Sequence, residues 1–184
     1  MRQLGLFLLF TLPLPVTLGA ETGACACNPA DPASLQTREC SLTNEAAKQP
    51  PGLTVFHLKD ASPRKPNRTL TLPTRIKTTG IQTLADLSPA ERTQLWTAAI
   101  AKAQALWGDQ WGLAYNGVKV RTQCHLHIHV GKLLRGVDTG ITLFVNHPSQ
   151  IPVPRDGSGL WVHPVGRRLK VHIKEQTTET VLLR

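Results

Sequence analysis

The stretch RTQCHLHIHVGKLL, Arg121–Leu134, decides the fold expected for this chain. Three of the seven histidines stand there at every second position, as His125, His127 and His129. A β-strand turns successive side chains to opposite faces and rises about 3.3 Å per residue, so the stretch predicts three imidazoles in a row along one face. The apolar residues between them then point to the other face, which a helix covers. We therefore expect a strand with one buried face and one histidine face suited to chemistry.

The neighbouring segments predict an α+β domain, with an antiparallel sheet of about five strands and one long covering helix. The helix is expected over 88–107, because Ser88 can act as its N-cap, Pro89 fits the first helical position and Glu91 completes a capping box. Gly108 then ends it. Besides the histidine strand, the strand candidates are 53–59, 70–72, 112–116, 140–145, 169–174 and 180–183.

The chain divides into four parts by composition. Arg2, an apolar run broken by two prolines and the small residues Gly19-Ala20 indicate an export signal. We therefore expect a periplasmic or secreted protein, which an uncleaved signal would leave associated with a membrane. The expected parts are a signal peptide at 1–20, a cysteine-bearing N-terminal extension at 21–52 with at most a short helix near 42–48, a main domain at 53–146 and a strand-rich C-terminal extension at 147–184.

The four cysteines are Cys25, Cys27, Cys40 and Cys124. In an oxidising compartment Cys40 can pair with either Cys25 or Cys27, and the sequence does not choose between them. Metal binding by the closely spaced pair at 25 and 27 is weakly signalled, because the spacing is not that of a zinc knuckle. Strand alternation turns Cys124 away from the histidines, so it is predicted to be a small buried hydrophobe.

The charge balance favours anionic partners. Without the signal, 20 Lys and Arg against 12 Asp and Glu leave a net charge of +8. Such a charge suits phosphate-bearing substrates or an anionic membrane surface. Nucleic acid is the least favoured partner, because the four tryptophans and the single tyrosine do not interleave with a basic stripe.

A metal site is the first alternative use of the histidines. Two imidazoles at i and i+2 can share a Zn²⁺ ion with bonds of about 2.0 Å, but three along a straight strand span too far. A secreted metal-binding protein using His125 and His127 would need a third ligand from elsewhere. The remaining histidines, none of which the sequence singles out, are His57, His147, His163 and His172. We expect no metal and no cofactor.

The alternating histidines, preceded by a capped helix and a turn with Asn116, resemble the histidine triad (HIT) superfamily of nucleotide hydrolases and transferases. LKD (58–60), LPTRIKTTGI (72–81), and LAYN followed four residues later by RTQ and then HLHIH (113–129) are most similar to the CDP-diacylglycerol pyrophosphatase branch. The similarity covers residues 53–135. Arg68 stands where most members carry a histidine, and Val120-Arg121 where many carry Gly-Gln. Both departures favour the pyrophosphatase branch.

The resemblance implies a HIT-like sheet and makes 53–146 the catalytic domain. His127 would attack the α-phosphorus of a nucleotide, while His125 and His129 bind phosphate oxygens or protonate the leaving group. A neutral imidazole is competent for this if one ring nitrogen is held as a donor, for instance by a backbone carbonyl. The implied substrate-binding residues are Asn116, Arg121 and Gln123, the last two on the histidine face if the strand reaches them.

The implied reaction is hydrolysis of a nucleoside-diphosphate-linked substrate through a nucleotidyl-histidine, with CDP-diacylglycerol cleaved to CMP and phosphatidate as the leading case. A soluble nucleotide such as a dinucleoside polyphosphate is the alternative substrate. Many relatives of this type are dimers, so the resemblance also allows a homodimer.

Overall fold

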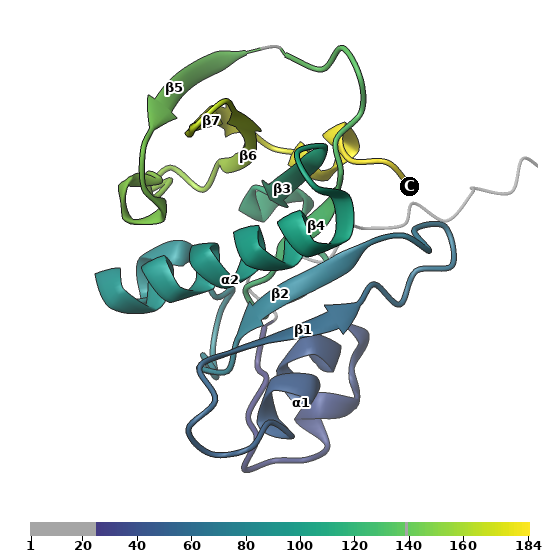
Figure 1. The fold of residues 1–184 in the computed structure, drawn as a ribbon. Coiled ribbons are helices and arrows are strands. Elements are labelled where there is room, and N and C mark those ends of the chain that lie inside the picture. The colour runs from purple at the N-terminus through teal and green to yellow at the C-terminus, as the bar shows by residue number, and fades with distance from the viewer. Residues whose placement is uncertain (1–24, 139) are drawn as a thin grey trace, which may run out of the picture.

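The computed structural model describes residues 25–138 and 140–184, so the expected signal peptide at 1–20 lies outside the described residues. These residues form an α+β structure around a seven-stranded antiparallel sheet (Figure 1). The mixed class agrees with the sequence, whereas the expected number of about five strands was too low. The sheet order is β1-β2-β4-β3-β6-β7-β5, and the strands are β1 (Val55–Lys59), β2 (Thr69–Pro73), β3 (Trp111–Tyr115), β4 (Ile128–Lys132), β5 (Ile141–Val145), β6 (Gly159–Val165) and β7 (Arg168–Glu175).

The long helix α2 (Pro89–Trp107) covers one face of the sheet. Ser88 and Glu91 form the predicted capping box, Pro89 is the first helical residue and Gly108 is the C-cap. The apolar side of α2 packs on the alternate strand residues of the main core, among them Ile128. One covering helix was nevertheless too simple a description. The described residues also form α1 (Ser41–Ala47) and the short 3-10 helices η1 (Ser34–Gln36), η2 (Arg38–Cys40), η3 (Leu84–Asp86), η4 (Val118–Val120), η5 (Pro148–Gln150) and η6 (Thr178–Val181).

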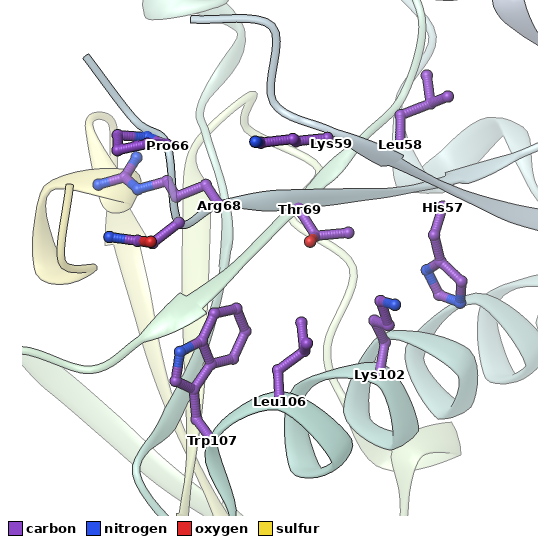
Figure 2. A pocket seen from close by; sticks show the side chains of 10 residues that line it. His57, Leu58, Lys59, Pro66, Arg68, Thr69, Lys102, Leu106 and Trp107 are labelled. Carbon is purple, nitrogen blue, oxygen red and sulfur yellow. The ribbon is translucent and has the colours of Figure 1, made fainter. Parts of the chain in front are cut away.

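A cavity of about 460 Å³ lies between the end of α2 and strands β1 and β2 (Figure 2). His57, Lys102 and Trp107 project into it from the strand and the helix. His125, His127 and His129 do not line this cavity. It therefore lies apart from the residues that the sequence selects for chemistry.

The strand expected from Arg121 was wrong over its first half, because β4 begins only at Ile128. The backbone before it bonds to other parts of the chain instead of to a neighbouring strand. The amide of Cys124 donates to the carbonyl of Glu39, and the carbonyl of Cys124 accepts from the amide of Gln82. These bonds draw residues 121–127 out of the sheet, so side chains alternate between the two faces of the sheet only from β4 onward.

The segment after residue 146 belongs to the same sheet as the segment before it. Strand β6 pairs with β3 on one side and with β7 on the other. The sequence analysis missed β6, because Pro164 and the glycines before it are typical of a loop. The strand expected over 180–183 is instead η6 followed by a single bridge between Leu133 and Leu182. The boundary expected at 146/147 thus runs through one continuous sheet.

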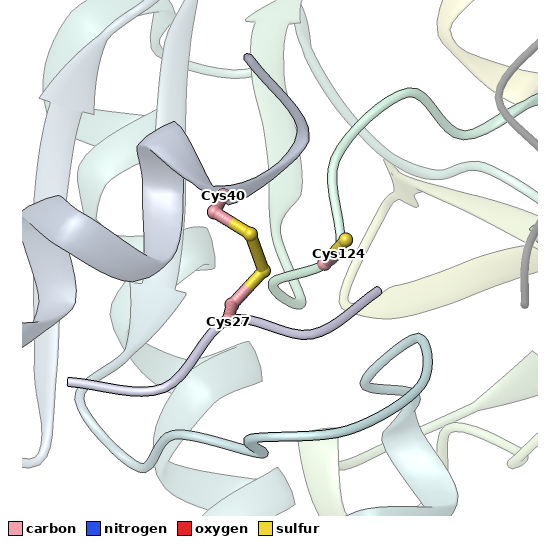
Figure 3. A group of neighbouring side chains, drawn as sticks. All are labelled: Cys27, Cys40 and Cys124. Atoms are coloured by element: carbon pink, nitrogen blue, oxygen red, sulfur yellow. A yellow bond between two sulfur atoms is a disulfide. The ribbon is translucent and has the colours of Figure 1, made fainter. Parts of the chain in front are cut away.

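The N-terminal extension lies against β1 and β2 on the side opposite to α2 (Figure 1). Two disulfides fix it, and they are Cys27–Cys40 and Cys25–Cys124. Cys27–Cys40 is one of the two expected pairings, and Figure 3 shows it next to Cys124. Cys124 is buried, as predicted, but it is also the disulfide partner of Cys25, because residues 121–127 leave the sheet and run beside the extension. Of the helices in the described ranges, none is long and apolar enough to cross a membrane.

Candidate active site

A cavity of about 1060 Å³ lies at the histidines. The side chains of His127 and His129 line it, whereas His125 does not. One wall is the sheet with the segment that precedes β4, and the opposite wall is the extension from η1 to α1. A row of three imidazoles was expected from the sequence. Only the rings of His127 and His129 line the cavity, and the ring of His125 lies outside it.

His127 has the arrangement that a nitrogen nucleophile needs. Its Nδ1 lies 2.9 Å from the backbone carbonyl of His125, which can only accept a hydrogen bond. The proton of the neutral ring is therefore on Nδ1, and the lone pair of Nε2 is available. The His127 ring meets that of His129 edge to face, with 4.9 Å between the ring centroids. A backbone carbonyl is thus present at Nδ1 of His127, as predicted for this ring.

Arg121 is buried below the site and binds backbone atoms. Its two terminal nitrogens donate to the carbonyls of His125 and Gln82, each at 2.7 Å. The carbonyl of His125 therefore accepts from both Arg121 and His127. Arg121 also lines the cavity, so its charge acts there while its two bonds position the segment that carries His127.

His129 projects from β4 and is oriented by residues far away in the sequence. The side-chain oxygen of Asn116 accepts from the Thr178 hydroxyl and from the Glu179 amide, each at 3.1 Å. The amide nitrogen of Asn116 consequently faces Nε2 of His129, at 3.4 Å. His129 accepts there, which places its proton on Nδ1, 3.5 Å from a carboxylate oxygen of Glu179 and 4.0 Å from one of Asp60.

His125 has a structural position rather than one in the cavity. Its ring is buried, and Nε2 lies 2.8 Å from the carbonyl of Pro73 at the end of β2. Within the described residues its Nδ1 has no hydrogen-bond partner. Its contribution to the site is therefore the backbone carbonyl that binds Arg121 and His127.

Gln123 joins the two walls of the cavity. Its side-chain nitrogen donates to the carbonyl of Arg38 at 2.8 Å, and its oxygen accepts from the Ser41 hydroxyl at 2.9 Å. The same oxygen accepts from the Leu42 amide at 3.4 Å. Gln123 lines the cavity as well, next to Thr122.

Burial keeps all three imidazoles neutral. Desolvation lowers the pKa of His125 to about 4. Desolvation, followed by the positive charges of neighbouring residues, lowers the pKa of His127 and of His129 well below the ordinary value of 6.5. At neutral pH the nucleophile candidate is therefore an uncharged imidazole, and no deprotonation has to precede its attack.

Glu179 and Asp60 are site residues that were not predicted from the sequence. Glu179 comes from η6, more than forty residues beyond β4, and its carboxylate binds both Lys65 at 2.5 Å and Arg68 at 2.7 Å. Asp60 is the last residue of the LKD motif, 58–60, but the motif by itself assigns it no role at the site. No local spacing signals Glu179, because the fold alone brings η6 to the cavity.

Comparisons of the chain with protein-family models and with curated proteins found no match. The HIT resemblance therefore stays a prediction, and the function has to be argued from the geometry of the cavity.

Proposed function

We propose that the protein hydrolyses a nucleoside-diphosphate-linked substrate through a covalent nucleotidyl-histidine on His127. The observation that supports this most is the state of the His127 ring. Nδ1 is held by a carbonyl, Nε2 is left with its lone pair, and the ring lines a cavity large enough for a nucleotide. The proposal keeps the HIT-like chemistry that the sequence motifs predict.

In the first step Nε2 of His127 forms a bond to the α-phosphorus, and the bond from that phosphorus to the bridging oxygen breaks. The leaving group departs as a phosphate monoester, whose second pKa is about 6, so it requires no proton at neutral pH. Water then attacks the same phosphorus, the bond to Nε2 breaks, and the nucleoside monophosphate leaves with the oxygen of that water. The proton that this water loses passes to solvent, because Nδ1 of His129 carries its own proton and Nε2 of that ring accepts from Asn116.

The lining of the cavity favours an anionic substrate with an apolar part. Three acidic residues line it, Glu45, Asp60 and Glu179. The basic residues outnumber them, and these are Arg38, Lys59, Arg64, Lys65 and Arg121. Leucines supply apolar surface on both walls, and they are Leu35, Leu42, Leu58 and Leu70. CDP-diacylglycerol, cleaved to CMP and phosphatidate, has both properties and remains the leading case. A soluble dinucleoside polyphosphate has only the charge.

An exported location is part of the proposal. The two disulfides suit an oxidising compartment such as the periplasm or the cell exterior, in line with the signal-like first twenty residues. The cationic surface would favour approach to an anionic bilayer that contains the lipid substrate. The alternative of a metal at the histidine row gains no support, because the carbonyl of Pro73 takes one nitrogen of His125 and the ring lies outside the cavity.

The test measures nucleoside monophosphate release by untagged protein from CDP-diacylglycerol micelles, nucleotide sugars and dinucleoside polyphosphates. A mixture quenched with alkali, which preserves phosphohistidine, should contain protein heavier by one nucleotidyl group, localised to His127 by peptide mass spectrometry. His127→Ala should abolish both the release and the adduct. His57→Ala is the matched control, because His57 is exposed and lies on the opposite face of the sheet. Full turnover by His127→Ala, with no adduct in the unsubstituted protein, would overturn the proposal.

A further inference from the structure

Three potential metal ligands meet at the other end of the sheet, away from the proposed nucleophile. They are His163 on β6, His172 on β7 and Asp138 in the segment between β4 and β5. One ligand atom from each lies within 4.8 Å of the other two. Neither the histidine motif nor the proposed hydrolysis uses this cluster.

The Nε2 atoms of the two histidine rings point toward each other. Nε2 of His163 and Nε2 of His172 are 3.3 Å apart, and Nε2 of His172 is 3.6 Å from Oδ1 of Asp138. Two ligands of a tetrahedral ion with bonds of 2.0–2.1 Å are separated by about 3.3 Å. The distance between the two nitrogens is thus the one that a shared zinc ion requires.

Trp161 holds both rings in place. Its indole stacks on His172 with 3.4 Å between centroids and 11° between planes, and on His163 at 5.2 Å and 22°. Its Nε1 donates to Glu175. The imidazoles are buried, so the orientation that brings the two nitrogens together is imposed by packing.

Asp138 provides access from solvent. Its side chain is 57% exposed, and both of its oxygens accept from Nζ of Lys170, at 2.6 and 2.7 Å. The carboxylate end of this pair faces water, whereas the side chain of Lys170 is 16% exposed, so a divalent cation can approach the carboxylate from solvent and compete with the lysine for it. Lys170 is then a competitor for the site, and its removal should favour the metal.

We propose that Asp138, His163 and His172 form a binding site for one divalent transition-metal ion, with Zn²⁺ as the first choice. Two imidazoles and one carboxylate are ligands that zinc accepts, and three protein ligands leave a fourth position for water or another small ligand. The site joins the segment after β4 to the β6–β7 pair. It is separate from the nucleotidyl-transfer site and does not depend on it.

The experiment titrates untagged, chelator-treated protein with Zn²⁺ by calorimetry and measures bound metal after dialysis. One zinc per chain is expected. Asp138→Asn should weaken binding by at least about tenfold, since even outer-shell partners of metal ligands are worth roughly 10–100-fold. Lys170→Gln should tighten binding, because the cation that occupies the carboxylate is removed. His127→Asn should bind zinc like the unsubstituted protein.

The choice of variants separates loss of zinc binding from loss of folding. Asp138 is on the surface side of the cluster, and Asp138→Asn and Lys170→Gln both keep a polar side chain of similar length, so the stacked rings in the core stay in place. His163→Asn, checked for folding by circular dichroism, should lose stoichiometric zinc. The absence of stoichiometric zinc in the unsubstituted protein would overturn the proposal, as would binding that Asp138→Asn and His163→Asn leave unchanged or that His127→Asn abolishes.

Discussion

Replacement of Arg68 by methionine should destabilise the protein and disturb the site at once. The side chain of Arg68 is 2% exposed, and its guanidinium binds the Glu179 carboxylate at 2.7 Å. It also donates to the carbonyls of Glu179 and Leu182 at 2.7 Å and to that of Leu183 at 3.1 Å. Methionine fills a similar volume and leaves all four acceptors without this partner.

The expected cost follows from this burial. Breaking a buried ion pair by removing one partner costs about 3–5 kcal/mol, and the carbonyl bonds are lost in the same event, so the values do not add. With a urea m-value of about 2 kcal/mol/M, the unfolding midpoint should fall by roughly 1.5–2.5 M. Turnover should fall too, because Glu179 orients Asn116 and thereby His129.

Arg75→Met is the matched control. Arg75 forms an ion pair with Glu91 at 3.1 Å, but its side chain is 58% exposed, and pairs of that kind contribute about 0–1 kcal/mol. Both variants remove one arginine from an arginine–glutamate pair, and they differ in burial. Equal midpoint shifts for Arg68→Met and Arg75→Met in urea denaturation would refute the reasoning.

Three further changes have defined outcomes. The double variant Cys25→Ala/Cys124→Ala opens a loop of 99 residues, so the free energy of unfolding should fall by about 4–5 kcal/mol in urea denaturation, and a loss below about 1 kcal/mol would contradict this. Lowering the pH from 6.5 to 4 should lower the free energy of unfolding by about 3 kcal/mol through His125 alone. The pKa of His125 falls to about 4 on folding, so in that pH interval only the unfolded chain takes up the proton. Urea denaturation curves across this range test the prediction, and an unchanged midpoint would be evidence against a neutral buried ring. Arg121→Lys should lower turnover by about tenfold or more while the protein stays folded, because an ammonium group cannot reproduce the planar two-nitrogen contact with two carbonyls, and turnover equal to that of the unsubstituted protein would show that the contact does not position His127.

The parts of the fold that the sequence predicts are those with local signals. The capping box at Ser88 and Glu91 lies within one helical turn, and α2 begins where these residues place it. β1, β2, β3, β5 and β7 each overlap a predicted strand. Strand β6 was not predicted because a proline usually argues against a strand. Pro164 is tolerated here because it lies near the end of β6, one pair before the β6–β7 turn, and that position is known only from the pairing with β7.

The contacts of the candidate site that could be predicted are those between residues close together in the sequence. The carbonyl that holds His127 belongs to His125, two residues earlier, and this partner follows from the chemistry of the ring. Glu179 and the Cys25–Cys124 disulfide could not be predicted, since both depend on contacts between segments that only the complete fold brings together. The two carbonyl partners of Arg121 also required the structure, because one of them, Gln82, is far away in the sequence.

The two walls of the larger cavity are attached to the protein in different ways, and this affects how its specificity can be redesigned. The sheet wall contains the His125 carbonyl on which two other side chains depend, so an insertion between 121 and 127 would destroy the reactive geometry. The wall from η1 to α1 is joined by two disulfides and the side chain of Gln123. Sequences grafted between Cys27 and Cys40 can therefore change the lining of this wall, provided that they keep the backbone carbonyls at 38 and 39, which bind Gln123 and Cys124.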